Sequence, residues 1–336
     1  MTTLAPPAPT RQRPRQAALL LGGVVAVGIL AACSLFVGVA DVSPGALLDP
    51  ARRGEALDLL AISRFPRTIA LVLAGAGLAV CGLIMQLLTR NPFVEPSTTG
   101  TMEFASLGLL VMALIWPDAP VLARMAVAAV AALAGTAVFL RLVSAVTIRD
   151  VLVVPLIGLV LSGIVGAVAT FVAYRYDLIQ SLSAWMTGDF SATIQGRYEL
   201  LWLAGVLTAL AVVVADRFTV AGLGEDVATN LGLDYRRTMA IGMSIVAVTT
   251  AAVVVTVGML GFIGLVVPNI VVLAMGGNAR RSVPWVAIGG ATLVLLCDLL
   301  ARTLVAPHEL PIGTILGVVG AGAFLAMLLK GVRGVR

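Results

Sequence analysis

Ten apolar runs, each about the length of one membrane crossing, dominate this chain. A transmembrane helix needs about 20 apolar residues to cross roughly 30 Å of hydrocarbon. Hydrophobic residues make up 60% of the 336 residues and charged residues 12%, whereas about 25% of a soluble domain is charged. The sequence therefore predicts an all-α integral membrane protein with about ten transmembrane helices. We expect them at residues 17–40, 66–88, 99–116, 120–140, 151–174, 197–215, 238–257, 259–276, 283–304 and 311–330.

The seventh and eighth runs form one nearly unbroken apolar stretch from Ile241 to Met275. This stretch is too long for one crossing, and glycines at 258, 261 and 264 interrupt it, so two helices joined by a tight turn are expected. Residues 1–16 are rich in Pro and Arg and predict a disordered tail. The membrane domain is expected over 17–330, followed by a second tail at 331–336.

The basic residues predict the orientation of the chain. An even number of spans puts both termini on one side, and most of the 22 Lys and Arg residues then lie on that side, which favours cytoplasmic termini. The exceptions cluster on the outer side: Arg52, Arg53, Arg64 and Arg67 precede the second span, and Arg302 lies near the outer end of the ninth. From the residues alone, this patch either contacts lipid headgroups or binds a partner.

Rare residue types exclude several classes of function. Lys330 is the only lysine, and its place at the C-terminal end rules out a Walker A loop and therefore an ATPase site of that type. His308 is the only histidine, so a histidine-based metal cluster or catalytic triad is excluded. The cysteines Cys33, Cys81 and Cys297 lack metal-ligand spacing. The basic residues occur singly or in pairs between apolar runs, which argues against nucleic-acid binding.

The longest late cytoplasmic loop, residues 216–237, predicts a short helix outside the membrane. Acidic residues after a glycine suit the positive end of a helix, and a later glycine suits its end. The residues concerned are Gly222, Gly224, Glu225, Asp226 and Gly232. Small residues at Ala228 and Gly232 would leave one face thin enough to sit in another protein's groove. The alternative is an ordinary amphipathic loop.

Small residues recur at four-residue spacing in two spans. They are Gly158, Ser162 and Gly166 in the fifth span, and Gly313 and Gly317 in the tenth. Such spacing lets helices approach closely. The pattern fits internal packing, and equally a subunit interface or the wall of a translocation path.

Charged residues within the spans are few. Asp298 and Arg302 are four residues apart in the ninth span, so they share a helix face and can neutralise each other. Glu103 lies near the start of the third. An ion-coupled carrier usually needs carboxylates along its path, and these residues make a poor relay.

Four ordered segments carry a resemblance to a known family. They are SRFPRTIALVLAGAGLAVCGLIMQLLTRNPFVEPSTTG (63–100), GEDVATNLGL (224–233), GMLGFIGLVVPNI (258–270) and HELPIGTILGVVGAGAFLAMLLK (308–330). Together they resemble the FecCD-type permeases of ATP-binding-cassette (ABC) importers for iron siderophores and vitamin B12. The resemblance implies a type II ABC importer permease fold in the bacterial cell membrane.

The resemblance also implies partners and site residues. It implies a second permease subunit, identical or related, two cytoplasmic ATPases that use ATP, an external substrate-binding protein and a ferric siderophore as cargo, with no cofactor on this chain. Arg64, Arg67 and Arg302 match arginines that dock the binding protein. The ATPase coupling loop is matched by Gly224, Glu225, Asp226, Ala228, Leu231 and Gly232. Vitamin B12 or haem is the alternative cargo, and an ion-coupled secondary transporter is the alternative of a different class.

The chain departs from the family pattern at three places. Asn269 replaces the usual histidine of the cytoplasmic gate region, and a basic residue expected shortly afterwards is absent at Val271 and Val272. The usual Gly-Ala-Pro near the end reads Gly-Ala-Gly at 320–322. The segment after Asn-Pro, FVEPSTTGTMEFASLG, resembles a subgroup for catecholate-type ferric siderophores, in which two different permeases pair.

Overall fold

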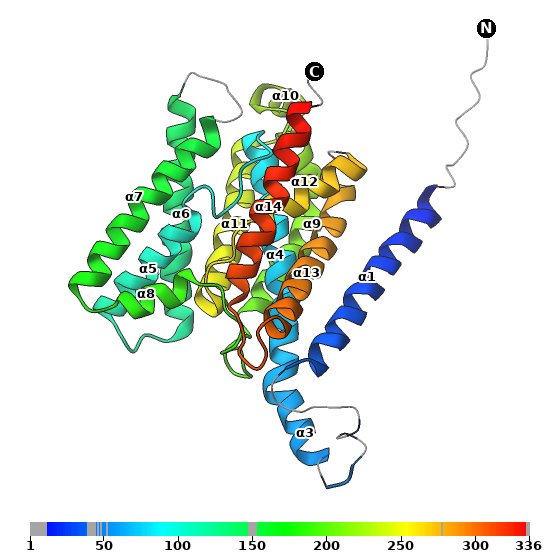
Figure 1. The fold of residues 1–336 in the computed structure, drawn as a ribbon. Helices are drawn as coiled ribbons and strands as arrows, with labels where there is room; N and C mark the ends of the chain where they lie inside the picture. Colours follow the sequence, from blue (N-terminus) through cyan, green and yellow to red (C-terminus); the bar gives the residue numbers. More distant parts are fainter. Residues whose placement is uncertain are drawn as a thin grey trace.

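The computed structural model describes residues 12–38, 45, 47, 49–51, 53–146, 153–276 and 278–333, and all regular structure within them is helical (Figure 1). The elements, where η1 is a π-helical segment, are α1 (Gln12–Phe36), α3 (Arg53–Leu59), η1 (Leu60–Arg64), α4 (Phe65–Thr89), α5 (Thr101–Ile115), α6 (Val121–Ala145), α7 (Val153–Arg175), α8 (Ile179–Met186), α9 (Leu201–Ala221), α10 (Glu225–Asn230), α11 (Tyr235–Val257), α12 (Ile263–Met275), α13 (Ala279–Thr303) and α14 (Ile312–Arg333).

Each of the ten predicted apolar spans overlaps a helix. Among the described residues, seven helices are long and apolar enough to cross a membrane: Ala18–Phe36, Arg53–Thr89, Val121–Ala145, Val153–Arg175, Leu201–Ala221, Tyr235–Val257 and Ala279–Thr303. Three shorter apolar helices, Thr101–Ile115, Ile263–Met275 and Ile312–Met327, correspond to the remaining spans. The all-helical membrane fold is therefore confirmed.

Several predicted boundaries were wrong. α1 begins at Gln12, so residues 12–16 are helical and do not belong to a disordered tail, while residues 1–11 lie outside the described residues. α9 continues to Ala221, which shortens the predicted 216–237 loop. α14 continues to Arg333, beyond the expected end at 330. Helices extend past the apolar runs because the backbone hydrogen bonds of a helix continue into polar sequence.

The second span continues outward as a long arm. α3, η1 and α4 follow one another without a break, and the arm projects beyond the bundle at its lower end in Figure 1. The Ile62 carbonyl of η1 accepts a hydrogen bond from the Gln195 N–H at 2.9 Å, so the segment before α9 is attached to the arm. We call this end of the bundle the α3 end and the opposite end, where α10 lies, the α10 end.

α4 is the central helix and packs against α9, α11, α12 and α13. Glycines allow two of these contacts to become backbone contacts. A Cβ on Gly75 would lie 2.5 Å from the Gly290 carbonyl oxygen of α13, and one on Gly82 would lie 2.0 Å from the Gly264 oxygen of α12. Small residues permit this close packing where lipid supplies no hydrophobic drive between helices.

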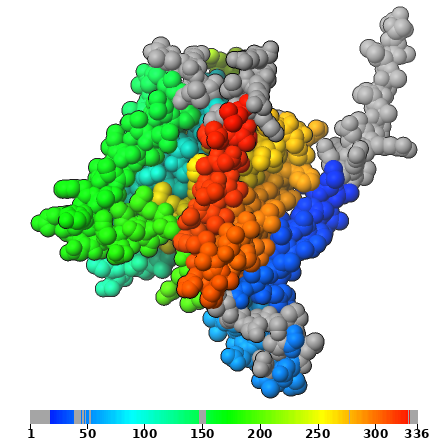
Figure 2. All heavy atoms as spheres, viewed as in Figure 1, coloured from blue at the N-terminus to red at the C-terminus, as the bar shows by residue number. Residues whose placement is uncertain are grey.

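Several helices expose long apolar faces, among them α1, α7 and α14. α14 lies exposed along the face of the bundle shown in Figure 2, and its exposed side chains include Val318 and Leu325. α7 exposes Leu159 and Phe171. α1 packs mainly on α13 and is otherwise exposed. Such surfaces suit lipid or another membrane helix.

Candidate functional site

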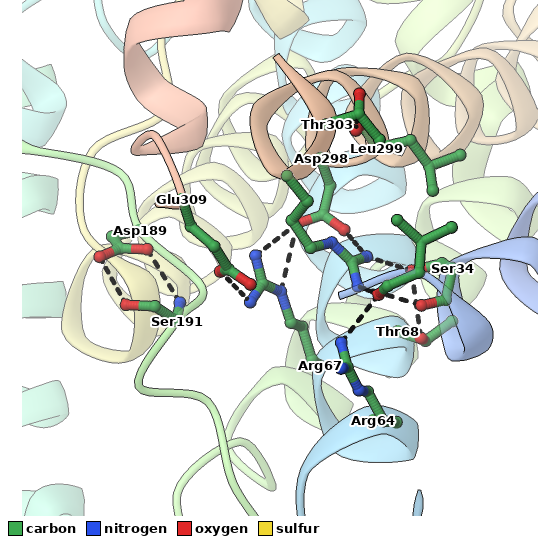
Figure 3. A network of polar contacts seen from close by, with 12 residues as sticks. Ser34, Arg64, Arg67, Thr68, Asp189, Ser191, Asp298, Leu299, Thr303 and Glu309 are labelled. Carbon is green, nitrogen blue, oxygen red and sulfur yellow. Dashed lines mark hydrogen bonds and ion pairs between the residues drawn. The ribbon is translucent and has the colours of Figure 1, made fainter. Parts of the chain in front are cut away.

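A network of charged side chains joins four segments at the α3 end (Figure 3). Arg67, near the start of α4, donates from Nη2 to Asp298 Oδ1 of α13 at 2.8 Å and from Nη1 to Glu309 Oε2 at 2.6 Å. Asp298 Oδ2 also contacts Arg302 one helical turn away, which confirms the pair predicted within the ninth span. One buried carboxylate therefore serves two arginines.

The same arginines hold the C-terminal end of α1. Arg302 Nη1 donates to the Val37 carbonyl oxygen at 2.6 Å and to the Ser34 oxygen at 3.0 Å, and Arg64 Nη1 donates to the Val37 oxygen at 2.8 Å. The last carbonyls of a helix lack partners within it and carry partial negative charge, so two guanidinium groups stabilise them. Gly38 leaves room for this contact, since a Cβ there would lie 1.9 Å from Arg64 Nη1.

The three arginines predicted to dock a binding protein are thus brought together, but they are buried. Arg64 and Arg67 are each 7% exposed and Arg302 is 4% exposed. Their hydrogen bonds are made to this chain. Docking through them stays a prediction, and an incoming carboxylate would have to compete with Asp298 and Glu309. Arg53, on α3, is exposed, while Arg52 lies outside the described residues.

The ion-pair partners of Arg67 were not predicted from the sequence. Asp298 is 231 residues away and Glu309 is 242 residues away, and neither spacing carries a local signal. A weak signal was available in the scarcity of charge. A buried carboxylate in an apolar span must find a cation, and Arg67 is among the few arginines at the same end.

The predicted short helix is present as α10, in the segment predicted for it. Gly224 (φ 111°) precedes it and Gly232 (φ 80°) follows it, and both adopt conformations that side chains disfavour. Glu225 and Asp226 occupy the first turn, where acidic residues suit the helix dipole. The Leu233 N–H donates to the Ala228 oxygen at 2.9 Å and closes the C-terminal end.

The predicted partner-facing side of α10 is contradicted at one of its two small residues: Gly232 is exposed with open space around it, but Ala228 is not. Ala228 is fully buried against the rest of the chain. The exposed apolar side chains in and beside α10 are instead Leu223, Val227 and Leu231, which are 57%, 45% and 65% exposed. Residues four apart lie on one helix face, so Val227 and Leu231 form one exposed apolar surface at the α10 end, whereas Leu223 lies before the non-helical Gly224. We call these three residues the α10 stripe.

The small residues of the two predicted helix faces have different environments. A Cβ on Gly158 would lie 1.9 Å from the Thr98 oxygen, and the Gly313 N–H donates to the Gly188 oxygen at 2.9 Å, so both serve internal packing. Ser162 is partly buried, with its Oγ 3.6 Å from where a Cβ on Gly100 would stand. Gly166 and Gly317 have no heavy atom within 4 Å of an added Cβ, so they face open space.

The profile of the FecCD transport family matches residues 25–330 of this chain. The chain belongs to that family. The petrobactin import system permease protein YclN of Bacillus subtilis (strain 168) is 48% identical over 302 residues, which cover 90% of this chain and 95% of that protein. The ferric-anguibactin transport system permease protein FatD of Vibrio anguillarum is 42% identical over 310 residues, covering 92% and 98%.

A solved structure supports the fold. A metal-chelate type ABC transporter in an inward-facing conformation superposes with a TM-score of 0.76 at 22% identity, covering 94% of this chain and 99% of that one. The family, the fold and the apolar helices together make this chain a multi-pass membrane protein of the permease type. They favour the importer permease over the ion-coupled carrier considered from the sequence.

Proposed function

We propose that this chain is the membrane permease subunit of an ABC importer that carries a ferric siderophore into a bacterial cell. The observation that carries the proposal is the similarity along nearly the whole chain to permeases named for petrobactin and ferric-anguibactin, at 48% and 42% identity. The haemin permease HmuU of Yersinia pestis is less similar, at 32% identity over 80% of this chain. Similarity therefore favours a siderophore over haem.

The chain works with partners in this proposal. It lacks a Walker-type lysine loop, so two cytoplasmic ATP-binding subunits supply the energy of ATP hydrolysis, and the chain itself needs no cofactor. A second permease, identical or related, covers the exposed apolar faces of α7 and α14, on which Gly166 and Gly317 have open space. An external binding protein delivers the siderophore at the α3 end.

The α10 end lies in the cytoplasm in this arrangement, together with both termini of the chain. The α10 stripe is then the contact for an ATPase subunit, because an exposed apolar row outside the membrane is costly unless a partner covers it. ATP binding and hydrolysis shift the population between outward-open and inward-open states through this contact. The transport step breaks no covalent bond in the siderophore.

Uptake by cells tests the proposed cargo. Cells that lack only this chain receive radiolabelled iron as a panel of ferric siderophores, with labelled haem and vitamin B12 in parallel. We expect uptake of one siderophore to be lost and to return with the wild-type chain. Loss of haem or vitamin B12 uptake with normal siderophore uptake would contradict the proposal.

A charge placed on the α10 stripe tests the contact with the ATPase. Leu231→Glu should lower siderophore uptake at least about tenfold, since a buried, unpaired charge at an interface weakens it by several kcal/mol. Thr229→Glu is the matched control, because Thr229 lies exposed on the opposite side of the same short helix. Equal uptake by the two variants would refute the assignment of the stripe.

A further inference from the structure

α12 begins inside the bundle. Its 13 residues span about 20 Å at 1.5 Å per residue, less than the roughly 30 Å of hydrocarbon. It starts after an irregular segment, residues 258–262, in which Phe262 has φ 68°. The first N–H groups of a helix have no partner within it, and at membrane depth water does not supply one. The N-terminus of α12 therefore needs an acceptor from elsewhere in the chain.

Glu95 supplies that acceptor. It lies between α4 and α5 and is 1% exposed. Its Oε1 accepts a hydrogen bond from the Phe262 N–H at 2.8 Å, and its carboxylate also interacts with the N–H groups of Gly264 and Leu265. A carboxylate at the N-terminus of a helix is stabilised by the helix dipole and makes strong hydrogen bonds. The buried segment that contains Glu95 thus supplies the hydrogen-bond acceptor that the segment before α12 needs.

The two segments also hold α14. A Cβ on Gly320 would lie 2.2 Å from the Phe262 Cβ, so α14 packs directly on Phe262. One helical turn later, the Phe324 ring meets the Phe93 ring edge-on with centroids 5.7 Å apart. Phe93 belongs to the same segment as Glu95. Phe93 and Phe262 therefore form the surface on which α14 packs, and they belong to the two segments joined by the Glu95–Phe262 hydrogen bond. We call this surface the seat of α14.

We propose that Glu95 is a positioning residue for transport: by holding the start of α12, it fixes the seat of α14 beside the translocation path. The inference rests on the proposed function, in which the exposed face of α14 lies against the second permease, and adds that the translocation path runs beside it. When the carboxylate is removed, Phe262 loses its hydrogen bond and α14 loses a fixed seat. ATP is then consumed without moving siderophore.

Two measurements test this role. Hydrogen exchange of the purified full chain reports on the seat itself and does not depend on the cargo. In Glu95→Ala we expect amide exchange at residues 258–266 and 317–326 to rise about tenfold, the effect of losing a hydrogen bond to a charged group. Glu95→Gln keeps an acceptor oxygen and should raise it less. Glu199→Ala is the matched control, since the exposed Glu199 also accepts a backbone N–H, that of Gly196, at 2.7 Å.

The second measurement is the ratio of ATP hydrolysed to siderophore imported, by the transporter isolated with its partner subunits and placed in liposomes. The ratio should rise in Glu95→Ala, rise less in Glu95→Gln and stay unchanged in Glu199→Ala. Unchanged exchange, faster exchange over the whole chain, or an unchanged ratio would each overturn the role of Glu95. If Glu95→Ala does not fold, Glu95→Gln decides by the same two criteria. A chain that carries another cargo would still give the exchange result, so the two proposals fail separately.

Discussion

Asp298→Asn should be among the most damaging single-atom changes in this chain. The Asp298 side chain is fully buried, and its two oxygens serve Arg67 at 2.8 Å and Arg302 of the same helix. With Arg64 and Glu309, the network holds three positive and two negative groups, so the substitution raises its net charge from +1 to +2. Breaking a buried ion pair on one side costs about 3–5 kcal/mol, because it leaves an uncompensated buried charge.

The chain contains its own control for this prediction. Arg280 and Asp216 form an ion pair at 2.9 Å, but their side chains are 72% and 58% exposed. An exposed pair contributes about 0–1 kcal/mol, so Asp216→Asn should be nearly silent. The two distances are almost equal, and the two variants therefore differ chiefly in burial.

Unfolding of the purified chain in mixed detergent micelles measures both variants. Asp298→Asn should shift the folding equilibrium by about two to three and a half powers of ten, at 1.4 kcal/mol per factor of ten. If Asp298→Asn lowers the free energy of unfolding by less than about 1 kcal/mol, as expected for Asp216→Asn, the reasoning is refuted. The network would then be a solvated cluster whose partners water replaces.

Two further predictions concern packing. Gly290→Ala should destabilise the chain by about 1–3 kcal/mol through overpacking, because its Cβ would lie 2.2 Å from the Gly75 oxygen, whereas Gly28→Ala, with no heavy atom within 4 Å of the new Cβ, should be neutral or slightly stabilising in the same unfolding assay. Asn269→Ala should cost about 1 kcal/mol, because Asn269 Nδ2 donates to the Pro92 oxygen at 2.7 Å and attaches α12 to the segment after α4. Asn269→His, which keeps a ring donor, should cost less, and equal losses would contradict this role of the amide.

The helices could be predicted from sequence because one physical length governs them. Hydrocarbon thickness sets the length of an apolar run, and the backbone inside lipid must be helical. The short α10 was predictable for a different reason. Its bounding glycines, Gly224 and Gly232, have positive φ, and that conformation limits the choice of residue at these two positions.

The 90–100 segment was harder to predict because its composition is misleading. Its run of Pro, Ser, Thr and Gly is typical of an exposed loop, yet Thr99 and Thr101 are buried. Their hydroxyls are 2.9 Å apart, and Thr101 lies 2.9 Å from the Thr136 hydroxyl of α6. Polar side chains that satisfy one another in this way can be buried without a large penalty. Hydropathy registers only their polarity, so the sequence placed Thr99 and Thr101 at the start of the third predicted span but did not predict these hydrogen bonds.

The prediction that Ala228 of α10 faces a partner protein was wrong for a related reason. Small size made Ala228 a candidate for a groove on another protein, but small size equally suits contact with the helix's own chain, and Ala228 is buried there. Only the tertiary structure decides which neighbour fills the space. The spacing of Leu223, Val227 and Leu231 was present in the sequence, but an apolar row in a short loop segment is also consistent with burial.

The arrangement of contacts limits which parts can move during transport. α4 is held at the α3 end by the ion pairs of Arg67. Further along, it meets α13 and α12 backbone to backbone, at glycines that leave no space for sliding. Close-packed interiors transmit displacement and do not absorb it. α10 itself contacts α9 and α11. Under the proposed function, a push on α10 reaches α4, α12 and α13 through those two helices, and we expect the change of shape where packing is open, at exposed faces such as those of α7 and α14.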